Sequence, residues 1–82
     1  MPVPSDQELR QRWAAALRAE LETRSWTQTK LAAESGVPQT KISQILRGVS
    51  GGSNRSRIAI AQALGVEVQE IWGYPPLTEV AS

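Results

Sequence analysis

Four polar side chains between residues 39 and 44 have the types and spacing needed to recognise a hydrogen-bonding surface. On a helix, Gln39, Thr40 and Gln44 would share one face, with Ser43 on its flank. A glutamine amide donates and accepts hydrogen bonds at once, which matches the paired donor and acceptor on the major-groove edge of adenine. We therefore predict base contacts at these four positions. The alternative, that they are only solvated helix residues, stays open.

The segment around these residues is predicted to form two short helices joined by a tight turn. Gly36 can take the positive φ of a helix C-terminal cap, and Pro38 suits the first turn of the helix that follows. Apolar residues recur at helical spacing on both sides of the turn, namely Leu31, Ala32, Ile42, Ile45 and Leu46. Two helices with a polar outer face on the second make a helix-turn-helix.

The run from Trp26 to Gly48, W-T-Q-x-x-L-A-x-x-x-G-V-P-x-x-x-I-S-x-I-L-x-G, resembles the lambda-repressor-like family of phage and bacterial regulators, of the Cro and cI type. Residues 60–66 look like that family's fourth helix and its exit, and residues 70–72 resemble the end of the Ner-like phage regulators. The resemblance implies a compact all-α bundle of about five short helices, with the helix-turn-helix formed by the second and third. It also implies base contacts at Gln39, Thr40 and Gln44, and a phosphate contact at Gln28.

Composition limits the other functions that the chain could have. Its 82 residues allow one small domain. The absence of cysteine and histidine removes the usual zinc and iron–sulfur ligands, thiolate nucleophiles and histidine bases. We therefore expect no metal, no cofactor, no small-molecule substrate and no enzymatic activity. No signal peptide or membrane span is apparent, so we expect a cytoplasmic protein at the nucleoid of a bacterial or phage-infected cell.

Positive charge is concentrated on the segment with the predicted helix-turn-helix, although the formal net charge is only +1. Residues 25–57 carry five basic residues and one acidic residue, whereas residues 58–82 carry three acidic residues and no basic residue. This distribution favours an anionic partner near the turn. An ordinary solvated surface is the alternative explanation.

The residues before the turn predict a first helix. Residues 1–4 look like a flexible arm, and Ser5 with Glu8 fits a capping box. An apolar stripe then runs toward Thr23, formed by Leu9, Trp13, Ala16, Leu17 and Leu21. Trp13 lies on this stripe, which favours a core position over base stacking. Trp26 is likewise expected in the core, and Thr27 is a good N-cap for the next helix.

The residues after the turn predict a loop, two more helices and a tail. The segment GVSGGSN at 48–54 lacks the features of a phosphate-binding loop, so we expect a mobile connection whose path on a DNA backbone stays open. A helix over 55–64, capped by Ser53 or Asn54, is predicted to bury Ile58, Ala61 and Leu64, with Ile60 as a further candidate. Gly65 ends it, and a short helix over 67–72 follows. The domain is thus expected to span 5–74, with a tail at 75–82.

Phosphate contacts are predicted from cationic and amide side chains around the turn, namely Gln28, Lys41, Arg47, Asn54 and Arg55. The roles of Lys30 and Arg57 depend on the path of the loop. One recognition helix reads few base pairs, so we expect a homodimer on a palindromic operator. The apolar residues Val68, Ile71, Trp72, Tyr74 and Leu77 either form the dimer contact or pack within one chain.

These observations predict a sequence-specific double-stranded DNA-binding transcriptional regulator, of the phage repressor kind. The alternative is an antitoxin or a protein-interaction adaptor, since fold alone does not settle function.

Overall fold

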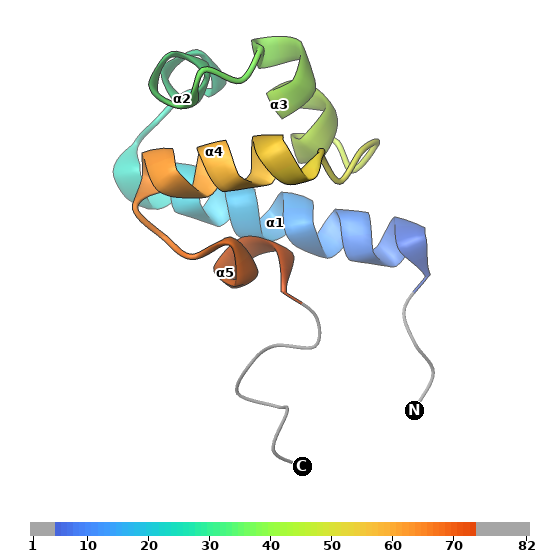
Figure 1. The fold of residues 1–82 in the computed structure, drawn as a ribbon. Helices are drawn as coiled ribbons and strands as arrows, with labels where there is room; N and C mark the ends of the chain where they lie inside the picture. The colour runs from blue at the N-terminus through green and yellow to red at the C-terminus, as the bar shows by residue number, and fades with distance from the viewer. Residues whose placement is uncertain (1–4, 74–82) are drawn as a thin grey trace.

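Five helices follow one another along residues 5–73, the part of the chain that the computed structural model describes (Figure 1). They are α1 (Asp6–Arg24), α2 (Gln28–Ser35), α3 (Gln39–Leu46), α4 (Asn54–Leu64) and α5 (Val68–Trp72). This range contains no strand, which confirms the predicted all-α bundle with its turn between the second and third helices. The predicted arm at 1–4, Tyr74 and the tail at 75–82 lie outside the described residues.

The helix ends form where side chains or glycines satisfy free backbone groups. Ser5 and Glu8 make the predicted capping box at α1, which ends at Arg24, one residue later than expected. The hydroxyl of Thr27 accepts a 3.0 Å hydrogen bond from the N–H of Lys30 and so caps α2. Ser53 caps α4 in the same way, accepting from the N–H of Ser56. Pro38 is the N-cap of α3 and does not lie within its first turn.

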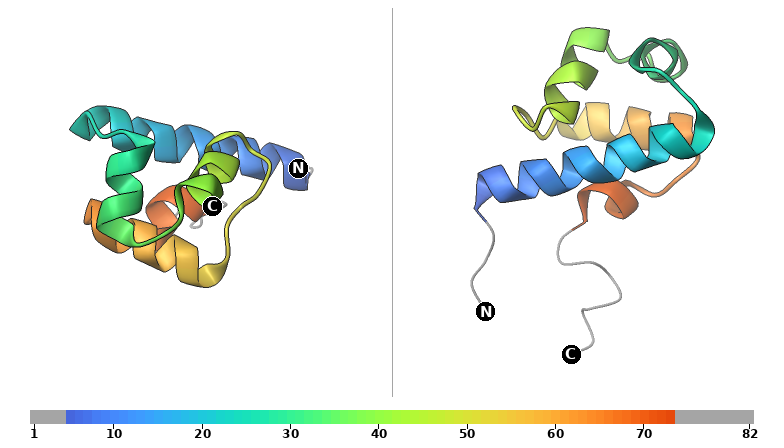
Figure 2. Two further views of the ribbon diagram at one scale, coloured as in Figure 1. Left: turned by 90° about the horizontal axis from the view of Figure 1, so that it is seen from above. Right: turned by 180° about the vertical axis from the view of Figure 1, so that it is seen from behind.

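The other four helices lie above, beside and beneath α1. In Figure 1 and Figure 2, α2 and α3 lie above α1 and α4, whereas α5 lies beneath α1. The helices that meet agree with this view, since α1 contacts α3 and α5, and α4 contacts α2 and α5. The turn between α2 and α3 therefore stands at one outer end of the molecule.

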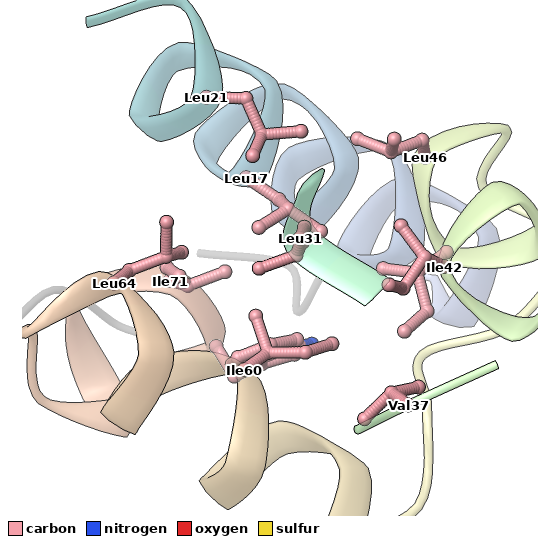
Figure 3. Close-up of a cluster of buried hydrophobic side chains, with 11 residues drawn as sticks. Leu17, Leu21, Leu31, Val37, Ile42, Leu46, Ile60, Leu64 and Ile71 are labelled. Carbon is pink, nitrogen blue, oxygen red and sulfur yellow. The ribbon is translucent and has the colours of Figure 1, made fainter. Parts of the chain in front are cut away.

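The core lies where these helices meet. Five side chains are fully buried there: Leu17, Leu31, Ile42, Ile45 and Ile60. They come from the first four helices, and Figure 3 shows Leu17, Leu31 and Ile60 directed toward one another. Leu46 is buried in the same cluster. Because α3 supplies three buried residues, the core fixes which of its faces points outward.

One prediction about the core is wrong, and one alternative that the sequence left open is resolved. Ile58 has 42% of its surface exposed, whereas Ile60, named only as a further candidate, is fully buried. Ile71 and Trp72 are only 3% and 6% exposed, because α5 closes the underside of the core. Packing within one chain therefore accounts for Ile71 and Trp72, and they are not free to form the dimer contact.

The glycine-rich loop between α3 and α4 has defined contacts. The Nε of Arg57 donates a 2.9 Å hydrogen bond to the carbonyl of Gly51. The Arg57 guanidinium lies 4.8 Å from the ring centroid of Trp13 and 5.8 Å from that of Trp72. Arg57 thus joins the loop to α1 and α5. The loop that we expected to be a mobile connection is held against the body of the domain.

Candidate nucleic-acid interface

The turn between α2 and α3 depends on a glycine conformation. Gly36 has φ of 76°, in the left-handed region, and its N–H donates a 2.9 Å hydrogen bond to the carbonyl of Ala32. Val37 follows with its side chain buried in the core. Pro38, in an extended conformation, then starts α3. The predicted role of Gly36 as the cap that allows a tight bend is confirmed.

The exposed face of α3 carries the residues predicted to contact bases. Ile42, Ile45 and Leu46 face the core, so the opposite side of this eight-residue helix faces solvent. Gln39, Thr40 and Gln44 are all exposed, and Ser43 is half-buried. Within residues 5–73, none of these four side chains makes a hydrogen bond to another part of the domain.

A shallow hollow brings these four side chains together with two of the predicted phosphate contacts. Its lining residues are Gln28, Gln39, Thr40, Ser43, Gln44 and Arg47. Gln28 is the first residue of α2, where the positive end of the helix dipole favours an anion. Arg47 immediately follows α3. The hollow thus combines amides and hydroxyls with two groups that are suited to bind an anion.

Two other predicted phosphate contacts line a separate hollow between the turn and the start of α4. Lys41, Ser53 and Arg55 are exposed there, and the half-buried Ser56 also lines this hollow. Its wall includes the turn residues 35–38, and no acidic side chain is among its lining residues. Asn54 is exposed at the start of α4 but lines neither hollow described here. The predicted phosphate contacts therefore divide between two places on the surface.

The remaining basic residues of the segment are engaged within the domain. The Nζ of Lys30 lies 2.9 Å from a carboxylate oxygen of Glu34 and 5.4 Å from the ring centroid of Trp26. Arg57 points inward, where burial lowers the pKa of its guanidinium, although an arginine stays protonated at neutral pH. Arg57 thus stabilises the fold and is no longer a candidate phosphate contact.

Three arginines of α1 have roles that the helical periodicity did not reveal. Arg18 donates a hydrogen bond to the last carbonyl of α3, and Arg10 donates to the carbonyl of Gly48, two residues further on. Arg24 donates to the last carbonyl of α4. The apolar stripe of the predicted first helix gives no information about their partners. Their carbonyl partners lie 28 to 40 residues away in the sequence, so no local pattern could have identified them.

The described part of the chain contains neither a metal-binding cluster nor a membrane-spanning helix. Within residues 5–73, no cluster of acidic side chains could hold a metal ion. No helix in the same range is long and apolar enough to cross a membrane.

Comparisons with known proteins agree with this geometry. No curated protein matches the chain. Its structure is similar to the crystal structure of the hypothetical transcription factor NHTF from Neisseria, with a TM-score of 0.75 and 26% sequence identity over 96% of this chain and 88% of that one. A helix-turn-helix family model matches residues 17–71. This range includes the turn and the α3 residues that line the two hollows. The chain therefore belongs to the Cro/cI-type helix-turn-helix family of DNA-binding transcriptional regulators.

Proposed function

We propose that this protein is a repressor of the phage type that binds a palindromic operator as a homodimer, with α3 in the major groove. The observation that carries the proposal is the hollow on α3, which brings four polar side chains together with Gln28 and Arg47. A helix fits the major groove, where each base pair displays its own pattern of donors and acceptors. Exposed amides and hydroxyls on such a helix are suited to read that pattern.

Base readout is assigned to Gln39, Thr40 and Gln44, with Ser43 in support. Gln39 and Thr40 lie in the first turn of α3, the end that points at base edges in helix-turn-helix complexes. Gln44 lies about one turn further along the exposed face. The glutamine amides are suited to the N6 and N7 atoms of adenine.

Phosphate contacts are assigned to the two hollows separately. Gln28 and Arg47 share the first hollow with the base-reading residues and would hold the DNA backbone beside them. Lys41 and Arg55 lie in the second hollow, and Asn54 lies beside it at the start of α4. A cationic hollow next to the α4 N-terminus is suited to a further phosphate. These contacts position the protein without reading sequence.

The homodimer follows from the small number of base pairs that one α3 can read. Two copies would place their α3 helices on half-sites roughly 34–36 Å apart. Because Ile71 and Trp72 are buried, the dimer contact must use other residues. Val49 and Ile58 are the large apolar side chains left exposed in the described range, at 61% and 42%. They are the first positions to mutate in a dimerisation test.

The test is selection of random DNA duplexes by the purified protein at two salt concentrations. We expect enrichment of a two-fold symmetric sequence, with affinity falling as salt rises because phosphate contacts release counterions. The double variant Gln39→Ala, Gln44→Ala should lose the enrichment and keep weak binding to all duplexes. Gln62→Ala removes an exposed glutamine from α4 and is the matched control, which should behave as the parent.

Two results would contradict the proposal. Enrichment of no sequence would favour a protein-interaction adaptor, which does not need base readout. Sedimentation that finds one subunit on the selected duplex would refute the dimer while leaving base readout intact.

A further inference from the structure

The C-terminal end of α3 is completed by a side chain from α1. A helix leaves its last four carbonyls without an intrahelical partner. In α3, the carbonyls of residues 43–45 accept hydrogen bonds from the N–H groups of residues 47–50, which follow the helix. The remaining carbonyl, that of Leu46, accepts a 2.8 Å hydrogen bond from Nη2 of Arg18. Arg18 thus supplies the donor that the local chain does not.

A second arginine of α1 holds the residues just beyond α3. The Nε of Arg10 donates a 3.1 Å hydrogen bond to the carbonyl of Gly48. Arg10 and Arg18 are eight residues apart, about two helical turns, so both lie on the side of α1 that faces α3. Both place a positive charge at the negative end of the α3 dipole. α1 therefore hydrogen bonds both to the last residue of α3 and to the chain that follows it.

α3 needs external support because its own sequence provides little. It has eight residues, and its N-cap, Pro38, makes no side-chain hydrogen bond. Helices this short are unstable alone, so contacts with the rest of the domain must fix their orientation. Gln44 lies in the last turn of α3. The orientation of its side chain therefore depends on how firmly this end is held.

We propose that Arg18 and Arg10 are positioning residues for DNA recognition. They fix the C-terminal half of α3, and with it the base-reading side chain of Gln44, without contacting DNA themselves. This inference rests on the proposed function, because it assumes that α3 reads bases. It adds two residues that lie outside both hollows.

The test compares Arg18→Ala with Arg24→Ala. Arg24 is the matched control, because its Nη2 makes a similar 2.7 Å hydrogen bond to the carbonyl of Leu64 at the end of α4. Affinities are measured for the duplex selected by the parent protein and for a random duplex. We expect Arg18→Ala to weaken binding to the selected duplex about tenfold, with random-duplex binding and the salt slope unchanged. Arg24→Ala should leave the ratio of the two affinities unchanged.

The base pairs at which the sequence preference is lost give a second prediction. Selection repeated with Arg18→Ala should relax the preference at the base pairs where Gln44→Ala relaxes it, and not where Gln39→Ala does. In the free protein, the amides of residues 47–50 should exchange with solvent faster in Arg18→Ala than in the parent. Arg18→Lys, which keeps a cationic donor, should recover part of both losses.

Several outcomes would overturn the inference. Equal weakening on both duplexes with a shallower salt slope would make Arg18 a phosphate contact. An equal effect of Arg24→Ala would indicate a general loss of stability. Unchanged affinity in Arg18→Ala would also refute it. If Arg18→Ala does not fold, Arg10→Ala must show the expected losses, and Arg18→Lys must show smaller losses of the same kind. Failure of the parent to select any sequence would instead refute the proposed function, and amide exchange would still show whether α1 holds α3.

Discussion

Replacement of Gly36 by alanine isolates the cost of the turn that presents α3. The φ of Gly36 is 76°, and a Cβ built there meets no atom within 4 Å. The cost is therefore confined to the backbone, at about 1–2 kcal/mol for a residue with a Cβ in the left-handed region. Alanine also lowers the conformational entropy of the unfolded chain, which stabilises the folded state by about 0.4–1 kcal/mol. We expect a net loss of about 1 kcal/mol, or a Tm lower by roughly 4–8 °C for a domain of this size.

Gly65 provides a control with the same geometry at a different place. It has φ of 74°, caps α4, and likewise has no atom within 4 Å of a built Cβ. Gly65→Ala should lose the same free energy of unfolding, within a few tenths of a kcal/mol. Asparagine tolerates the left-handed region better, so Gly36→Asn should lose less than Gly36→Ala.

Urea unfolding of the three variants and the parent measures these differences. A Gly36→Ala variant as stable as the parent would refute the backbone argument. A loss of several kcal/mol would show that the added methyl group meets other atoms. At a temperature where both alanine variants are folded, only Gly36→Ala should weaken binding to the selected duplex, because only this turn orients α3.

Three other predictions follow from the structure. Gln39→Ala should cost roughly 1–3 kcal/mol on the selected duplex and little on random DNA, measured by titration; equal losses on both would assign Gln39 to the backbone. Arg47→Ala should weaken binding to all sequences alike and reduce the salt slope by about one, so an unchanged slope would remove it from the phosphate contacts. Ile60→Ala should lose about 2–5 kcal/mol in urea unfolding because its side chain is fully buried. Ile58→Ala, at an exposed position of the same helix, should lose much less, and equal losses would contradict the assigned core.

The helix ends and the turn were predictable because their signals are local. A capping box, an N-cap threonine and a helix-ending glycine act within four residues, and all three form as the sequence indicated at Ser5, Thr27 and Gly36. The buried face of α3 was predictable for the same reason, since Ile42, Ile45 and Leu46 recur at helical spacing.

The buried face of α4 was not predictable from apolar residues alone. Ile60, Ala61 and Leu64 face the core, and the next position of that face toward the N-terminus is Arg57. An arginine there hid the true face and made Ile58 look like its continuation. Arg57 is accommodated because the Trp13 and Trp72 rings lie against its guanidinium and the Gly51 carbonyl accepts its Nε.

The other differences between the sequence-based predictions and the structure arise from contacts between distant parts of the chain. The loop after α3 looked mobile by composition, yet Arg10 and Arg57 hydrogen bond to its carbonyls. The sequence left open whether Ile71 and Trp72 form a dimer contact or pack within one chain, because the contact of α5 with α1 and α4 joins distant parts of the chain. For the site, the sequence predicted the exposed face of α3, but not that Lys41 and Arg55 would lie in a separate hollow.

An NMR titration of the labelled protein with its selected duplex tests the central claim most directly. The claim is that the exposed face of α3 lies in the major groove with its amides against base edges. We predict that the side-chain amides of Gln39 and Gln44 shift most and show nuclear Overhauser contacts to major-groove protons. Contacts confined to α1 or α5, with both amides unchanged at saturation, would contradict the claim.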